Sequence, residues 1–164
     1  MMSDKVIQRL ALGEIATIGT LYDSRRDCFL PSSLLASGLP TDIIIEVDVQ
    51  KSNVSIGHGD TYQEKFKLLG IGADLSASIF AGLVSLRGYS QFLTEQPESN
   101  SLHATIYHKV TTFQDKLNLA SLELKNCLAI SAIQGSEATL VVGGIEWGSQ
   151  CIVTARHRLF DCNE

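Results

Sequence analysis

The chain has 164 residues, of which 45% are hydrophobic and 19% are charged, so we expect a single globular domain over 1–164. A net charge of −5 argues against a broad phosphate-binding surface, and no nucleic-acid partner is expected. The cysteines form no CxxC pair and no leader-like apolar run opens the chain, which predicts free thiols in the cytoplasm and no metal site.

The first part of the chain predicts a strand, a turn and a return strand. Residues 15–23 are rich in β-branched and aromatic side chains, 24–27 are polar, and 28–31 are apolar again. We expect three residues to form the structural turn, with the Asp carboxylate capping the amides that follow: Tyr22, Asp23 and Arg25. Residues 43–49 then alternate apolar and acidic side chains over their second half, which predicts a half-buried strand that 53–56 can extend.

Residues 71–83 satisfy two periodicities at once. Every odd position is apolar, as in a strand, and small residues also recur at helical spacing. A tilted membrane-spanning strand needs ~9–11 residues, so this stretch is long enough to cross a bilayer. The simpler interpretation is a helix that packs its small residues against a sheet. The candidates for membrane insertion, or for a groove that holds an apolar ligand, are Ile71, Ala73, Leu75, Ala77, Ile79, Phe80, Leu83 and Val84.

The second part of the chain predicts a long strand over 102–113, a helix over 115–130, and strands over 138–145 and 151–155. His103 and His108 fall on opposite faces of the long strand, so they cannot converge on a metal, and His108 is expected to be partly buried with a hydrogen bond. The order of strands and helices lacks a regular βαβ alternation, which indicates an α+β fold.

Four segments resemble, in order, the membrane-attack-complex/perforin (MACPF) domain of the stonefish-toxin type and its fungal relatives. They are Ala11-Leu12-Gly13 with 19–25 and Leu30-Pro31, then 73–93, 104–113 and 141–154. The match covers the N-terminal half of such a module. It implies a bent, mainly antiparallel sheet flanked by helices that unroll into membrane-spanning hairpins. It also implies a hinge or family signature at Gly143, Gly144, Trp147 and Gly148, with glycines near 143 relieving crowding where the sheet bends.

No catalytic constellation is visible, because His108, Tyr107, Cys151 and Glu46 are scattered along the chain. We therefore expect no cofactor and no catalytic residue. The favoured hypothesis is a non-enzymatic perforin-like protein that acts as a truncated oligomerising or partner-binding module. Strands 151–155 and 102–113 are the candidate open edges, and a homodimer or full-length relatives are the expected partners. A membrane-perforating protein, a carrier of an apolar small molecule and a small enzyme built on the same fold stay open as alternatives.

Overall fold

The computed structural model describes residues 6–84, 88–96 and 101–158, and it holds two three-stranded antiparallel sheets. The large sheet has the order β3-β4-β6, and the small one has the order β2-β1-β5. The strands are β1 (Thr20–Asp23), β2 (Cys28–Ser33), β3 (Ile44–Gly57), β4 (Ser101–Leu117), β5 (Leu140–Val141) and β6 (Gly144–Arg158). The expected α+β class with a mainly antiparallel sheet is confirmed.

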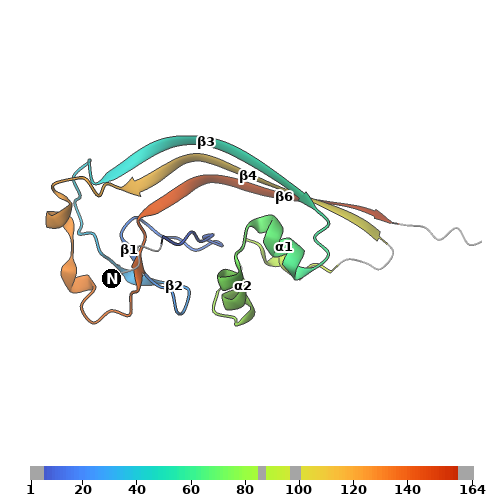
Figure 1. The fold of residues 1–164 in the computed structure, drawn as a ribbon, viewed down its shortest axis with the longest axis horizontal. Helices are drawn as coiled ribbons and strands as arrows, with labels where there is room; N and C mark the ends of the chain where they lie inside the picture. The colour runs from blue at the N-terminus through green and yellow to red at the C-terminus, as the bar shows by residue number, and fades with distance from the viewer. Residues whose placement is uncertain (1–5, 85–87, 97–100, 159–164) are drawn as a thin grey trace, which may run out of the picture.

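The large sheet forms a long arch, with the small sheet beneath one end and helices beneath the other (Figure 1). The register shifts between Asp48 and Lys51 of β3 and between Thr111 and Phe113 of β4, at one level across the sheet. Such bulges bend a strand and increase its twist. Gly148 of β6 lies opposite Thr111, so the three strands change course together at this level.

The bend requires a glycine at position 148. A Cβ atom there would lie 1.8 Å from the carbonyl oxygen of Val110, a distance that no real side chain tolerates. Gly143 has nothing within 4 Å of such an atom, and Gly144 meets only ordinary van der Waals contacts. Of the glycines named from the sequence, Gly148 is therefore the one at which two strands approach closely, next to the register shift in β4.

The helices are α1 (Tyr62–Leu69), α2 (Ala73–Phe80) and α3 (Ser90–Thr94). A capping box formed by Thr61 and Glu64 begins α1, and Gly70 ends it in the left-handed conformation at φ 70°. Figure 1 shows α1 beneath the arch with α2 beyond it. A hydrophobic core joins the helices to β4 and to the N-terminal segment through Leu12, Phe66, Leu69, Ile71, Leu75, Leu93 and Tyr107.

The predicted helix over 115–130 is wrong. β4 continues to Leu117, and the loop that follows holds two short 3-10 turns, η1 (Leu124–Cys127) and η2 (Ile130–Ala132). The Asn118 side chain donates to the Asp42 carbonyl and accepts from the Ala120 amide, so side-chain bonds replace helical ones at the first turn. The loop packs on a second core made of Ile18, Leu35, Ile43 and Cys127.

The C-terminal half of the large sheet also differs from expectation. The strand predicted over 138–145 divides between β5, in the small sheet, and the start of β6, and β6 then continues through the strand predicted over 151–155. Within β6 the Trp147 indole stacks on Phe113 of β4 with ring centroids 6.0 Å apart. The indole nitrogen also donates to the Asp115 carboxylate at 2.7 Å. Strand 102–113 was expected as an open edge, but it lies in β4 at the centre of the sheet. The edges of the described sheet are β3 and β6.

Candidate functional site

A cleft of about 840 Å³ lies between α3 and the edge strand β6. Volumes of this size occur in small-molecule sites. Tyr89, Phe92 and Ile152 supply apolar surface, and polar side chains of both elements surround them. The polar lining residues are Gln91, Glu95, Gln150, Thr154 and Arg156, and Gly13 and Gly88 also line the cleft. The cleft therefore offers both apolar contacts and hydrogen bonds beside an edge strand of the described sheet.

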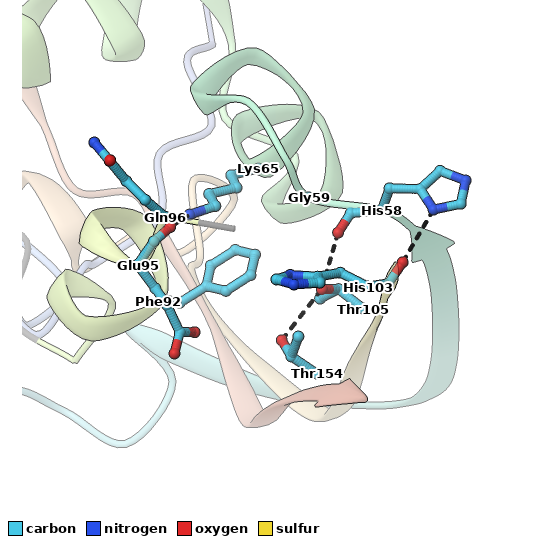
Figure 2. Close-up of a pocket in the computed structure, with 9 residues that line it drawn as sticks. All are labelled: His58, Gly59, Lys65, Phe92, Glu95, Gln96, His103, Thr105 and Thr154. Carbon is cyan, nitrogen blue, oxygen red and sulfur yellow. Dashed lines mark hydrogen bonds between the residues drawn. The ribbon is translucent and has the colours of Figure 1, made fainter. Parts of the chain in front are cut away.

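A small polar cavity adjoins this cleft and shares Phe92, Glu95 and Thr154 with it (Figure 2). It has a volume of about 10 Å³, which is room for a single water molecule. The hydroxyl groups of Thr105 and Thr154 lie 3.2 Å apart on its floor, and Thr105 donates to the carbonyl of His58. Figure 2 shows the imidazole of His58 turned away from these hydroxyl groups. The cavity is thus a polar contact between helices and sheet rather than a ligand pocket.

Lys65 of α1 is the charged group at the centre of this junction. Only 5% of the residue is exposed, and its ammonium donates to the carbonyl oxygens of Leu93, at 3.3 Å, and Glu95. The same ammonium lies 5.3 Å from the centroid of the Phe92 ring. Burial lowers the pKa of Lys65, because it penalises the charged form. Lys65 therefore ties α1 to the last carbonyl groups of α3, where a positive charge is favourable.

Glu95 connects the same region to the edge strand. Its carboxylate forms an ion pair with the guanidinium of Arg156 on β6. Lys65 holds the backbone at Glu95 while Arg156 holds its side chain. We call these three residues the helix–sheet latch. They connect α1, the end of α3 and β6 through polar contacts in addition to the hydrophobic core.

Tyr107 of β4 lies in the core beneath the helices. It is 6% exposed, and its hydroxyl has no hydrogen-bond partner among the described residues. Burial raises the pKa of Tyr107 to about 12, with a smaller contribution from Tyr89. A buried hydroxyl without a partner costs stability, so this side chain is held in place by packing alone.

We expect Tyr107→Phe to leave the protein as stable as before or to stabilise it by up to about 1 kcal/mol, because it removes an unsatisfied hydroxyl. The folded pKa of Tyr107 lies above the free value of about 10, so its neutral form contributes stability that is lost as the pH rises toward 12. Urea unfolding at neutral and alkaline pH measures both effects. The variant should lose less stability than the wild type between about pH 10 and 12. A large loss of stability at neutral pH would contradict the absence of a partner.

A second polar cluster fixes the turn between β1 and β2. The Asp23 carboxylate is fully buried and accepts bonds from the Arg25 amide at 3.0 Å and its Nε at 2.9 Å. The hydrogen bonds from Arg25 lower the pKa of Asp23. The Tyr22 hydroxyl donates to Asp27, and burial raises the pKa of Tyr22. The three residues named from the sequence thus lie together in this turn.

No residue pattern pointed to Asp27, which the structure places between the turn and the helices. Its side chain is 3% exposed, and its carboxylate accepts hydrogen bonds from the hydroxyl groups of Tyr22 and of Ser78 in α2. The guanidinium of Arg9 lies 3.4 Å from it. Asp27 adopts a left-handed backbone at φ 50°, which aspartate tolerates in turns. The sequence shows Asp27 only as an aspartate in a polar turn. That pattern does not distinguish a buried acceptor of hydrogen bonds from a side chain exposed to solvent.

The residues proposed for membrane insertion or an apolar groove divide between core and surface, and none of them lines the cleft. Ile71 and Leu75 belong to the helical core, with Ile79 and Val84 packed against it. The remaining members are exposed, namely Ala73, Ala77, Phe80 and Leu83. The small residues of α2 therefore do not face the sheet as expected. No helix in the described part of the chain is long and apolar enough to cross a bilayer.

The residues considered for catalysis do not meet in one cavity. His108 and Cys151 lie directly opposite each other on neighbouring strands, on the convex face of the arch. His108 is half-buried there, with its Nε2 atom 2.9 Å from the Ser52 hydroxyl. Tyr107 points to the concave face, and Glu46 is exposed near the far end of β3. The described structure therefore brings His108 and Cys151 together and keeps Tyr107 and Glu46 apart from them.

The family model described as "SNTX, MACPF/CDC-like domain" matches residues 6–158. Cytolytic toxin-beta of Scorpaena plumieri is 31% identical over 150 residues, which are 90% of this chain and 21% of the toxin subunit. Neoverrucotoxin subunit beta of Synanceia verrucosa is 30% identical over 168 residues, which cover 99% of this chain and 23% of that protein. The chain therefore spans less than a quarter of the length of these relatives.

The fold has a solved counterpart in the stonustoxin structure. The two superpose with a TM-score of 0.61 at 23% identity, covering 89% of this chain and 18% of the other. At this identity the comparison establishes the fold alone. The expected resemblance of the sheet and helices to a stonefish-toxin MACPF module is confirmed.

Proposed function

Because the chain belongs to the SNTX, MACPF/CDC-like domain family, we propose that it is a non-enzymatic perforin-like module that acts by associating with other chains. The observation that carries this proposal is the large sheet, in which both β3 and β6 are long strands with no described neighbour on their outer sides. Unpaired backbone groups along such edges bind further strands. The free thiols of Cys28, Cys127 and Cys151 support the cytoplasm as its compartment.

The names of the relatives support association as the mode of action. Neoverrucotoxin subunit beta and neoverrucotoxin subunit alpha are each named as one subunit of a toxin, and this chain matches both. For this chain we propose a second copy of itself, or a longer relative, as the partner. The geometry favours strand pairing, because main-chain hydrogen bonds along a sheet edge can join chains of unrelated side-chain sequence.

Sedimentation velocity at increasing protein concentration tests the association. We expect the chain to form a larger species in the micromolar range, because each edge strand spans fourteen or fifteen residues. The same preparation should release no dye from vesicles of phosphatidylcholine, with or without phosphatidylserine. A chain that stays monomeric throughout would contradict the proposal, and dye release would contradict its non-perforating part.

A hydrophobic-ligand carrier is the second candidate, and the cleft between α3 and β6 is the observation that favours it. Phe92 and Ile152 would contact the apolar part of a small molecule, while Arg156 at one end would meet a polar group. A rise in melting temperature with an apolar ligand, lost in Phe92→Ala, would favour this function over strand pairing.

A further inference from the structure

β6 is the more suitable of the two edges for pairing two copies of the chain. It runs as one strand of 15 residues without an inserted residue of its own. β3 is interrupted between Asp48 and Lys51, where its pairing with β4 shifts. A continuous strand can keep one register along a new partner, whereas a bulge disrupts the ladder.

The charges of β6 are complementary to those of β6 in a second copy of the chain that runs antiparallel to it. Cys151 is the eighth of its 15 residues, so a two-fold axis through Cys151 pairs the whole strand with itself. In this register Glu146 of one copy lies opposite Arg156 of the other, and the pair occurs twice. The same operation on β3 places Glu46 and Asp48 opposite uncharged serine and asparagine side chains.

The side chains on the concave face of β6 are accessible along the cleft. Gln150, Ile152, Thr154 and Arg156 point to this face and line the cleft of about 840 Å³. In the two-fold register Gln150 of one copy faces Ile152 of the other, and Gly148 faces Thr154. The side chains of the added strand therefore extend this surface, and small residues oppose each other at the bend.

We propose that two copies of this chain pair antiparallel through β6 around a two-fold axis at Cys151, which joins the two arches into one six-stranded sheet. This inference rests on the proposed associating function and specifies its partner and register. Cys151 then lies opposite Cys151 of the second copy on the exposed convex face. Directly opposed residues have Cα atoms about 4.5–5.5 Å apart, which is within the range that a disulfide bridges.

Cysteine cross-linking tests the register. Cys28, Cys127 and Cys162 are replaced by alanine or serine, which leaves Cys151 as the single thiol. The matched control also carries Cys151→Ser and Ser149→Cys, a position equally exposed on the same face. In the proposed register two thiols at 149 are displaced by four residues, or about 13 Å along the strands. We expect a mild oxidant to form the Cys151 dimer at least about tenfold faster than the control dimer, since only the former has disulfide geometry.

Charge reversal provides a second measurement that needs no thiol. Glu146→Lys should weaken the dimer about tenfold or more, because it faces Arg156 of the second copy with a like charge. Adding Arg156→Glu together with Glu95→Lys, which keeps an ion pair within the latch, should restore most of the loss. Lys109→Gln is the matched control, because Lys109 contacts Glu146 only within the chain at 3.1 Å, and it should leave the dimer unchanged. Glu46→Lys on β3 should also have no effect.

The possible results separate the inference from the function on which it rests. A dimer that cross-links equally well at 149, or that dissociates with Glu46→Lys, overturns the register but leaves the associating function intact. Open-ended polymers would also overturn it, because a two-fold contact closes after two copies. A protein that is monomeric at every concentration overturns both.

Discussion

Replacing Gly148 by alanine is expected to destabilise the protein by about 3 kcal/mol, because the new methyl group would overlap a backbone atom that cannot move aside. The overlap is with the carbonyl oxygen of Val110, 1.8 Å from the ideal Cβ position. Relief would require β4 and β6 to separate at the bend. Trp147 is the single tryptophan of the chain and the neighbour of the substituted residue, so its fluorescence during urea unfolding measures the change directly.

Gly143→Ala is the matched control, because an added Cβ at that position has open space around it. Alanine restricts the unfolded chain more than glycine does, so the variant loses less backbone entropy when it folds. Where no strain results, the free energy of unfolding should be unchanged or higher by about 0.5 kcal/mol. Equal losses in the two variants would show that glycine content, rather than the close approach at the bend, sets the stability of the arch.

Replacing Lys65 by alanine is expected to destabilise the protein by about 2–4 kcal/mol, because it removes charged hydrogen bonds and leaves buried carbonyl groups without a donor. The carbonyls concerned are those of Leu93 and Glu95. The substitution also removes the aliphatic stem that packs beside the Phe92 ring. Chemical unfolding measures the total, and proteolysis near 88–96 reports whether α3 is released first.

Lys67→Ala is the matched control, because Lys67 lies on the exposed side of the same helix. Its loss should change the stability by no more than about 0.5 kcal/mol. Lys65→Met retains the stem and removes the charge, so it separates packing from hydrogen bonding. If Met is tolerated as well as the native lysine, the latch depends on packing and the charged bonds contribute nothing measurable.

The two features lie at different levels of the arch and act on different strand contacts. Gly148 allows β6 to follow the bulge of β4, and Lys65 with Glu95 and Arg156 holds the helices against the same strand. β6 therefore contains the glycine at the bend, one residue of the latch and an outer edge with no neighbour among the described residues. If the proposed pairing occurs, Arg156 has two acidic partners within reach, Glu95 in its own chain and Glu146 of the second copy. Dimer formation is then expected to be sensitive to the state of the latch.

Sequence patterns were sufficient for the first turn, the long central strand and the family. The alternation over 102–113 predicted a long strand, and the Tyr22–Arg25 region predicted the first turn, because both signals are local. The ordered motifs predicted an α+β fold of the stonefish-toxin type, which the family match over 6–158 confirms. The helix expected over 115–130 failed, since the spacing of leucines could not reveal the bonds that Asn118 makes with a distant segment.

Other properties depend on which elements pack together, and the chain order does not specify this. Alternation divides β4 into two faces, but only the position of the helices buries Thr105 and Tyr107 and leaves Leu102 and Ile106 exposed. The latch connects Lys65 to Arg156, which lie 91 positions apart in the chain. Each of them contacts Glu95. Local residue patterns determined the first turn, the long strand and the family of this protein. The tertiary structure decided which glycine the bend needs and which strands lie at the edges of the described sheet, because both depend on distances between strands that are remote in sequence.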